Sequence, residues 1–518
     1  MDFKKVHQSR MAGGWGLSSL DKKYKGINMM TDELAKNLAA VFNPKAVAVI
    51  GASSTFGKWG QLILSNITAG NFEGKIFPVN PKEKSICGLP AYSRLTDIPE
   101  PVDLAFITTP AGTIPGILEE CGEKGIKGVV LITSGFSETD EDGKRLEKHI
   151  ASMCREKGMA LMGPNTMGII CPYAKLFATG SHTRPREGSV AFVSQSGNLG
   201  LQLVHWAEEQ GIGVSLFVGS GNEAMFSCTD YLEYLEHDPR TDIIVLYMEN
   251  VGKGRHFLDV ARKIHRKKPV IVLKGGRTDA GRTAAVSHTG SMGGDQAIFR
   301  AVCRQAGLLD VRFPTELLDL SAGFSSLPLA RGNRVGIVTL GGGWGVVTAD
   351  ECNLRGLVIP DIPDSIVETI GKYLPQFWSK GNPVDLVGTQ DLQVPIVAVE
   401  ELLKWDGIDA VISLGIVGRL ELVRSLIEST REVDASISPE FLDQMSALSR
   451  EYEKDYIAKI VELMETYEKP VVGVSLANTN EGTVRPVAGK RYSGVFYQTP
   501  ENAVNVLARM VDYYRFVS

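Results

Sequence analysis

Three apolar runs along the chain each meet a turn rich in small residues, and a stretch with helical spacing follows each turn. The segments read AVAVIGASSTFG from Ala46, SVAFVSQSGNLG from Ser189 and RVGIVTLGGGWG from Arg334, about 145 residues apart. This interval is too long for a solenoid repeat. It is typical of successive α/β domains, each of which opens with a strand, a tight turn and a helix.

Further apolar runs after each opening predict buried parallel strands. They lie at 75–81, 103–110, 128–135 and 160–165, at 213–219, 242–250 and 269–276, and at 410–416 and 470–476. Amphipathic stretches predict intervening helices, for example at 141–158, 229–238 and 257–267. We therefore expect an α/β fold of three doubly wound sheets, with ligands beyond the carboxyl ends of the strands.

Two polar segments, 184–188 (RPREG) and 330–333 (ARGN), predict the domain boundaries. The expected domains span 36–185, 186–330 and 331–518, and residues 1–35 are expected to form a loosely attached N-terminal arm. The charged stretch at about 420–467 is expected to be a helical insertion in the third domain. Such a stretch is more typical of a solvated face than of a functional site.

Composition narrows the functional classes. The 518 residues include 43% hydrophobic and 22% charged residues, with a formal net charge of −5. Because acids and bases are interspersed, the chain lacks the basic field that binding to nucleic acid or to a membrane surface requires. Seven scattered cysteines without a CxxC pair argue against a disulfide framework and a zinc site. With no signal-like or membrane-spanning apolar run, we expect a soluble cytoplasmic protein.

Each glycine-rich turn feeds a predicted helix, and the free N–H groups at a helix N-terminus suit a phosphate. The first turn, Gly51–Gly60, lacks both the GxGxxG and the GxxxxGK[ST] spacing, so a phosphate-bearing ligand and a plain tight turn both stay open. The second, Ser194–Asn198, could bind an anion or could be ordinary N-capping by Ser196 or Asn198. The third, Gly341–Gly345, has four glycines in five residues, which indicates positive φ or close backbone approach.

One histidine stands out among the eight. His288 lies in AAVSHTGSMGGD among small residues, ahead of a helix predicted to begin near Asp295. It has no cysteine or second histidine nearby to share a metal. This leaves the roles of general base or nucleophile. A serine hydrolase is disfavoured because the chain has no GxSxG elbow.

Taken in order, the motifs resemble the NDP-forming acyl-CoA synthetases, which include succinyl-CoA synthetases and ADP-forming acetyl-CoA synthetases. SHTGSMGG at Ser287 is similar to the family's phosphohistidine loop. VSQSGNLG at Val193, and GGGWG at Gly341 with GNPVDL at Gly381, are similar to its two phosphate-holding helix starts. FPVNPK at Phe77, ITTPA at Ile107, ITSGFSE at Ile132 and GPNTMG at Gly163 resemble its CoA-binding domain.

The resemblance implies a Rossmann-like CoA-binding domain followed by two flavodoxin-like ligase domains. It also implies a relay in which phosphate attacks an acyl-CoA, His288 takes the phosphoryl group from the acyl phosphate, and ADP receives it. Glu249, in LYMENVG, matches the glutamate that orients the histidine. Backbone and side-chain donors of both turns would stabilise the phosphoryl group, namely Ser194, Ser196, Gly197, Asn198, Gly341, Gly342, Gly343 and Gly345.

The resemblance also assigns the CoA site. Residues at the phosphate-side turn would be Gly51, Ser53, Ser54, Phe56 and Gly57, with Lys82 near the anionic groups. Pro110, Ser134 and Asn165 would lie along the pantetheine arm or near the thioester. Phe56 could instead only pack. No ATP-grasp region is recognisable in the sequence, so the chain resembles an α subunit that acts with an ATP-grasp β subunit in a hetero-oligomer. ATP or ADP and Mg²⁺ would then bind that partner, and the substrate would be a small carboxylic acid or its acyl-CoA.

Two other functions stay open at this point. A CoA- or acyl-CoA-sensing regulatory protein could keep the fold without catalysis, although the joint presence of His288, Glu249 and both glycine-rich helix starts argues against it. An NAD-dependent dehydrogenase is suggested only by the strand-turn-helix opening. Its glycine spacing is wrong for a dinucleotide.

Overall fold

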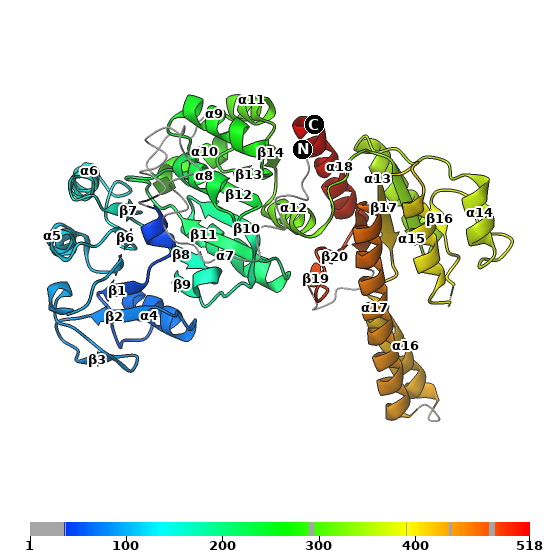
Figure 1. Cartoon of the computed structure of the whole chain (residues 1–518), viewed down its shortest axis with the longest axis horizontal. Coiled ribbons are helices and arrows are strands. Elements are labelled where there is room, and N and C mark those ends of the chain that lie inside the picture. Colours follow the sequence, from blue (N-terminus) through cyan, green and yellow to red (C-terminus); the bar gives the residue numbers. More distant parts are fainter. Residues whose placement is uncertain (1–35, 37, 290–294, 390, 435–437, 476–481) are drawn as a thin grey trace.

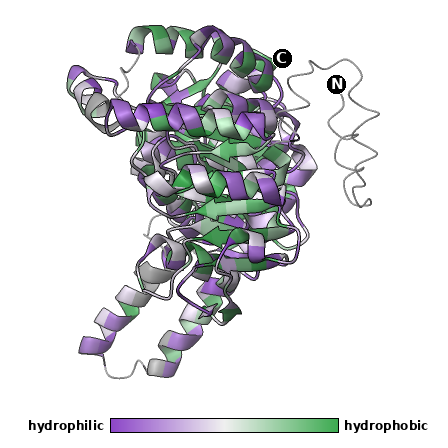
Figure 2. Ribbon diagram, turned by 90° about the vertical axis from the view of Figure 1, so that its left-hand side faces the viewer, coloured by the Kyte–Doolittle hydropathy of each residue, from purple (hydrophilic) through white to green (hydrophobic). Residues whose placement is uncertain are grey.

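Three parallel-stranded bodies follow one another along the chain (Figure 1). The computed structural model describes residues 36, 38–289, 295–389, 391–434, 438–475 and 482–518. The predicted N-terminal arm, residues 1–35, lies outside the described residues. Helices flank the strands of each sheet (Figure 1). Seen from the end of the first body, Figure 2 shows apolar strands between helices of mixed hydropathy.

The first sheet has five parallel strands in the order β2-β1-β5-β6-β7. The strands are β1 (Ala46–Ile50), β2 (Lys75–Val79), β5 (Leu104–Ile107), β6 (Gly128–Leu131) and β7 (Ala160–Met162). The helices are α4 (Trp59–Ala69), α5 (Ile114–Lys124) and α6 (Glu141–Glu156). Short elements between them are β3 (Ser85–Ile86), β4 (Leu89–Pro90), η2 (Leu95–Asp97) and η3 (Ala111–Thr113).

The second sheet has the order β14-β13-β12-β10-β11-β8-β9. Its strands are β8 (Gly168–Cys171), β9 (Leu176–Thr179), β10 (Glu187–Ser194), β11 (Val214–Gly219), β12 (Ile243–Met248), β13 (Val270–Lys274) and β14 (Leu309–Val311), with η4 (Pro172–Ala174) between the first two. Its helices are α7 (Gly197–Glu209), α8 (Cys228–His237), α9 (Gly254–His265), α10 (Asp279–Thr289), α11 (Gln296–Ala306) and α12 (Pro314–Ser326).

Two strands of this second sheet precede the boundary predicted at residues 185 and 186. β8 pairs antiparallel with β11, where Phe217 lies opposite Ile170, and β9 pairs antiparallel with β8. The division between the sheets therefore falls between β7 and β8, earlier in the chain than the polar segment 184–188. That segment is the connection from β9 into β10.

The third sheet has the order β16-β15-β17-β18-β20-β19. Its strands are β15 (Val335–Thr339), β16 (Val384–Asp385), β17 (Ala410–Leu414), β18 (Val471–Val474), β19 (Val484–Pro486) and β20 (Ser493–Tyr497). Its helices are α13 (Gly342–Leu354), α14 (Asp364–Gly371), α15 (Val394–Lys404) and α18 (Pro500–Val517). The predicted insertion is an antiparallel helical hairpin of α16 (Arg419–Val433) and α17 (Pro439–Tyr467), which projects from this body (Figure 1).

The parallel strands of all three sheets follow one topology. Numbered by their order within each body, they run 2-1-3-4-5, the doubly wound order whose switch point lies beside the opening strand. The opening strands are β1, β10 and β15, and each of the three glycine-rich turns directly follows one of them. The fold class expected from the sequence is confirmed, and each turn lies where such sheets bind ligands.

The second and third bodies share a continuous apolar core. Helix α12 packs on both β13 and α18, and α18 in turn packs on α13. The ring of His265, at the end of α9, lies 4.9 Å from the ring of Tyr513 on α18. Because these contacts are buried, the two bodies are held together as one unit.

Candidate functional site

The first turn brings the backbone of helix α4 close to the end of β1. Gly51 has a φ of +87°, and its N–H donates to Val79 O at 3.0 Å. A Cβ on Gly60 would lie 1.9 Å from Gly51 O, so only glycine permits this approach. The N-cap residue of α4, Lys58, makes no side-chain capping hydrogen bond. The turn thus presents backbone groups at the switch point of the first sheet.

Side chains at this turn are held by a carboxylate that the sequence did not single out. The backbone N–H and the hydroxyl of Ser54 both donate to Glu83, and this hydroxyl hydrogen bond holds the pKa of Glu83 below its usual value. Ser53 is buried and accepts the N–H of Thr55 at 3.1 Å. Phe56 is 89% exposed, so it does not pack against the protein.

The remaining residues predicted at this turn lie on its rim. Gly57 has a φ of +82°, and its N–H donates to Gln61 Oε1 at 3.2 Å. The side chain of Lys82 is exposed, and its backbone N–H donates to Asn80 Oδ1 at 2.8 Å. An anion at this turn would meet the start of α4, with Glu83 on the side of Ser54.

A cavity of about 200 Å³ lies where the first body meets the second. Two of the predicted pantetheine residues, Ser134 and Asn165, line it, whereas Pro110 lies outside it. The other lining residues are Trp59, Thr108, Ile132, Thr133, Thr166 and Met167. All six lie inside segments named above from the sequence, but local spacing did not indicate which side chains faced the cavity.

The cavity leads to the start of helix α7 through Met167. A Cβ on Gly197, the first residue of α7, would lie 2.1 Å from Cγ of Met167, so this side chain covers the helix start. Ser196 occupies the N-cap position but makes no side-chain capping hydrogen bond, and the hydroxyl of Ser194 donates to Ser196 O at 2.6 Å. The capping that the sequence offered for Ser196 is therefore not present. By contrast, Asp295 caps α11 through the N–H groups of Ala297 and Ile298.

Glu249 lies directly after β12 and is buried beside this turn. Its backbone N–H donates to Gln195 Oε1 at 2.6 Å, and its backbone O accepts Lys274 Nζ at 2.6 Å. The hydroxyl of Tyr247 donates to its carboxylate at 3.3 Å. Lys274 is buried, which lowers the pKa of its ammonium, while the nearby Glu249 opposes that effect. Glu249, which the resemblance assigns to orienting His288, is thus held in place by Gln195, Tyr247 and Lys274.

His288 is the penultimate residue of α10. The sequence predicted a helix only from near Asp295, but the backbone is already helical from Asp279 to Thr289, because the preceding DAGRTAA favours a helix. The side chain of His288 and residues 290–294 lie outside the described residues. α11 begins at Gln296 with Asp295 as its cap, in agreement with the expected helix start.

The third turn opens helix α13 at the surface. Gly341 is its N-cap without a side-chain hydrogen bond, and Thr339 Oγ1 donates to Gly341 O at 2.8 Å. A Cβ on Gly342 would lie 2.9 Å from Asp385, and one on Gly345 would lie 3.1 Å from Pro383, so these two glycines make room for the segment that contains GNPVDL. Gly343 has open space around it.

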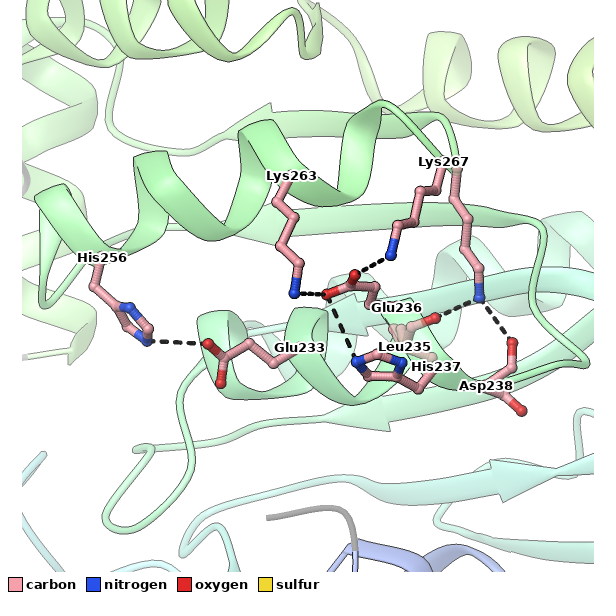
Figure 3. Close-up of polar contacts among 9 residues, drawn as sticks. Glu233, Leu235, Glu236, His237, Asp238, His256, Lys263 and Lys267 are labelled. Atoms are coloured by element: carbon pink, nitrogen blue, oxygen red, sulfur yellow. Dashed lines mark hydrogen bonds and ion pairs between the residues drawn. The ribbon is translucent and has the colours of Figure 1, made fainter. Parts of the chain in front are cut away.

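Apart from the cavity and the three turns, a cluster of charged groups lies on α8 and α9 (Figure 3). Asp230, Glu233 and His256 place one ligand-type atom each within 4.8 Å of one another. Asp230 is already engaged, since it accepts the N–H of Ser227 at 2.7 Å in a capping box. None of these residues lines the cavity.

Nearby, the almost fully buried carboxylate of Glu236 pairs with Lys263 at 3.0 Å and with Lys267 at 2.5 Å (Figure 3). Burial would raise the pKa of Glu236, but its hydrogen bonds from Lys267 and Lys263 hold it below the usual value. These ion pairs join α8 to α9 and have a structural role.

Comparison with known proteins connects this geometry to one family. Three family models match in order along the chain: a CoA binding domain at 45–172, a succinyl-CoA ligase like flavodoxin domain at 187–324 and a Ligase-CoA domain at 335–418. The α subunit of ADP-forming acetate–CoA ligase II from Pyrococcus furiosus is 38% identical over 435 residues, which are 83% of this chain and 94% of that protein. The chain belongs to the ADP-forming acyl-CoA ligase family.

Other relatives agree with this family assignment. The α subunit of ADP-forming acetate–CoA ligase I from the same organism is 42% identical over 359 residues, covering 68% of this chain and 78% of that protein. A solved acetyl-coenzyme A synthetase 1 from Ca. Korarchaeum cryptofilum, in complex with phosphate and ADP, has 31% identity and a TM-score of 0.77. The structural match covers 93% of this chain and 98% of the Korarchaeum chain.

Membership in the ADP-forming acyl-CoA ligase family supports the enzyme reading over the regulatory alternative. It also supports CoA as the ligand of the first domain. Among the described helices, none is both long enough and apolar enough to cross a membrane.

Proposed function

We propose that the chain is the α subunit of an ADP-forming acyl-CoA synthetase that uses His288 as a phosphoryl carrier. Phosphate attacks the thioester carbonyl of an acyl-CoA, the C–S bond breaks, and CoA leaves as the thiol. A ring nitrogen of His288 then attacks the phosphorus of the acyl phosphate, which releases the carboxylate. ADP, bound with Mg²⁺ by an ATP-grasp β subunit, takes the phosphoryl group to give ATP. The reverse sequence forms acyl-CoA from the acid.

The observation that carries this proposal is the cavity between the first two bodies. Ser134 and Asn165 line it from the CoA side, and Met167 joins it to the uncapped start of α7. A thioester in the cavity would thus lie beside unpaired N–H groups and the positive end of a helix dipole, where an acyl phosphate is stabilised. Glu249, held by Gln195, is the residue proposed to fix the tautomer of His288.

The third turn supplies the second half of the proposed phosphate site. Helix α7 packs on α12, α13 packs on α18, and α12 and α18 pack on each other. The two uncapped helices therefore flank one shared helix pair. We propose that Gly341–Gly345 approaches the phosphohistidine when the β subunit is bound.

Phosphorylation of His288 is the decisive test. The chain is mixed with its ATP-grasp subunit, Mg²⁺ and ATP labelled in the γ-phosphate, and we expect acid-labile, base-stable label on the chain. His288→Asn should remove the label and turnover while CoA binding, measured by calorimetry, stays unchanged. Glu249→Gln should slow labelling by about 10- to 100-fold, because it loosens the orientation of the ring.

His205→Asn is the matched control, since His205 is a half-exposed histidine on α7. This variant should label like the unmodified chain. Label that persists in His288→Asn, or an active complex that never carries label, would contradict the proposal. The acid substrate is then identified by CoA-dependent phosphate release across acetate, branched, aryl and dicarboxylic acids.

A further inference from the structure

The last residue of β13 is a lysine in a strand that is otherwise apolar. The strand reads VIVLK, and Val270 and Val272 lie on the same face of the sheet as Lys274, where both belong to the apolar core. Lys274 is itself only 2% exposed. A buried ammonium group costs free energy unless charges and hydrogen bonds compensate it, and an apolar side chain would fill the same position without that cost. The contacts of Lys274 therefore indicate what its charge does.

Hydrogen bonds direct this ammonium group to the residue proposed to orient His288. Lys274 Nζ donates to Glu249 O at 2.6 Å and to Gly275 O at 2.7 Å, which are the carbonyls that directly follow β12 and β13. The two strands pair in parallel with Met248 beside Lys274, so both end at the same level of the sheet. The lysine thus fixes the backbone of Glu249 relative to β13.

The carboxylate of Glu249 lies close to the same ammonium group. Burial lowers the pKa of Lys274, and the negative charge of Glu249 opposes this effect. Glu249 is only 7% exposed, so solvent does little to stabilise its charge. A Cβ on Gly275 would lie 3.3 Å from Cγ of Glu249 and 2.6 Å from the hydroxyl oxygen of Tyr247, so glycine lets both side chains close over the end of β13. Each of the two buried charges therefore has the other as a counter-charge.

Other groups around Glu249 are neutral or lie one residue further away. Burial and the carboxylate of Glu249 raise the pKa of Tyr247, whose hydroxyl donates to that carboxylate, and Arg277 partly opposes the shift. The side chain of Gln195 accepts the backbone N–H of Glu249 and donates to the carboxylate of Glu223. Burial raises the pKa of Glu223. The ammonium group on β13 thus supplies a positive charge that neither the tyrosine nor the amide can supply.

On the basis of the proposed function, in which Glu249 orients His288, we propose that Lys274 is a positioning residue for phosphoryl transfer. Its charge keeps the carboxylate of Glu249 ionised, so that this carboxylate can accept the ring N–H of His288. A neutral carboxyl group accepts such an N–H more weakly and would fix the tautomer less firmly. Lys274 acts through Glu249 and takes no part in the bonds that form and break.

A double-mutant cycle on the full-length chain tests whether the two charges compensate each other, without any nucleotide. Lys274→Met and Glu249→Gln each leave one buried charge without its counter-charge, so each should lower the thermal midpoint. The double variant removes both charges. It should therefore be destabilised by less than the sum of the two single changes.

Lys469→Met is the matched control for this cycle. Lys469 Nζ also donates to two backbone oxygens, those of Leu403 and Trp405, and burial also lowers its pKa. It precedes β18 in the third body, so it shares no partner with Glu249. The losses caused by Lys469→Met and Glu249→Gln should add.

The pH dependence of His288 labelling tests the role in phosphoryl transfer. The chain is assembled with its ATP-grasp subunit, Mg²⁺ and ATP labelled in the γ-phosphate, and the single-turnover rate of labelling is measured from acid to alkaline pH. Without the ammonium group Glu249 binds a proton at higher pH, so Lys274→Met should move the acid side of the rate profile upward by about one pH unit. In the Glu249→Gln background the same change should not alter the shape of the profile. Lys469→Met should give the profile of the unmodified chain.

The possible results separate this proposal from the function on which it rests. An active complex that never carries label contradicts the phosphohistidine itself. Normal labelling of the unmodified chain, with a Lys274→Met profile of unchanged shape, overturns only the role of Lys274. Strict additivity of Lys274→Met and Glu249→Gln does the same. If Lys274→Met does not fold alone, the double variant should fold, and a double variant that is also unfolded would overturn the proposal.

Discussion

The side-chain amide of Gln195 ties the turn before α7 to the end of β12. Its Oε1 accepts the N–H groups of Glu249 and Asn250, at 2.6 and 3.0 Å, and its Nε2 donates to Asn250 O at 3.1 Å. One residue therefore sets both the proposed phosphate turn and the backbone that carries Glu249. Its effect on phosphoryl transfer would be through these neighbours.

Gln195→Met keeps the length of the side chain and removes the acceptor. Two partly buried N–H groups then lose their partner, which should cost about 1–3 kcal/mol in the free energy of unfolding. Labelling of His288 should slow in the same direction as in Glu249→Gln, with CoA affinity unchanged. Denaturant unfolding and the labelling assay measure the two effects. Gln202→Met, at an exposed position on α7, is the control, and equal stability of the two variants would contradict this account.

For individual residues, the sequence identifies those that directly follow a predicted strand. It does not identify residues whose position depends on contacts with distant parts of the chain. Ser134 and Asn165 follow apolar runs, and both line the cavity. Glu83 accepts a hydrogen bond from Ser54 across 29 positions, and Met167, in the connection from β7 to β8, covers Gly197 of α7. No local spacing encodes such pairs, because they depend on how the sheets pack.

Helix α4 shows how one missing side chain permits an element to dock. Gly60→Ala would place a methyl group 1.9 Å from the backbone oxygen of Gly51, and neither backbone can yield without moving β1 or α4. We expect a loss of about 1–3 kcal/mol in unfolding free energy, as for overpacking, together with weaker CoA binding.

Gly116→Ala is the matched control for this change. Gly116 also lies in a helix, α5, but a Cβ there meets nothing within 4 Å. Because alanine is the better helix former, this variant should be more stable by about 0.5–1 kcal/mol. Thermal unfolding of both variants, with and without CoA, measures the contrast. Equal effects would show that the close approach of α4 to β1 is not what requires glycine.

The strands after the three openings were predictable as elements because apolar β-rich runs alternate with amphipathic stretches. It was harder to predict from the sequence which sheet each strand joins. β8 and β9 are each four residues long and lie beside the polar segment 184–188, which resembles a linker. They join the second sheet through pairing with β11, a long-range contact that periodicity does not report. The hairpin of α16 and α17 was predictable as helical.

On the scale of the whole molecule, two buried titratable groups lie where the second and third bodies join. Burial lowers the pKa of His265 to about 3, and its Nδ1 accepts the N–H of Val270 at 3.0 Å. Burial raises the pKa of Asp319 to about 6, partly offset by a hydrogen bond from Asn502 on α18. These groups give opposite pH dependences.

Below about pH 6.5 the imidazole of His265 is protonated in the unfolded chain but stays neutral in the folded chain. The free energy of unfolding therefore falls as the pH falls from 6.5. His265→Gln, which keeps an acceptor, should remove this loss. The stability difference between the native chain and this variant should change by about 2 kcal/mol between pH 7.5 and pH 5. Denaturant unfolding at the two pH values measures it.

Asp319→Asn should reveal a pH dependence of stability of the opposite sign. The folded chain binds its proton more tightly, so the contribution of Asp319 to stability decreases as the pH rises from about 4 to 6. The native chain should therefore lose about 1.5 kcal/mol relative to this variant between pH 5 and pH 7.5. Differences of the same sign in both variants would contradict the assignment of these pKa shifts.

The pairing of β8 with β11 has one more consequence for the molecule as a whole. Without β8, the parallel part of the second sheet would end in β11, six residues of unpaired N–H and C=O groups that another chain could extend. With the hairpin in place, the outermost strand is β9, only four residues long. The segment that links the first two bodies thereby also protects the sheet against edge-to-edge aggregation.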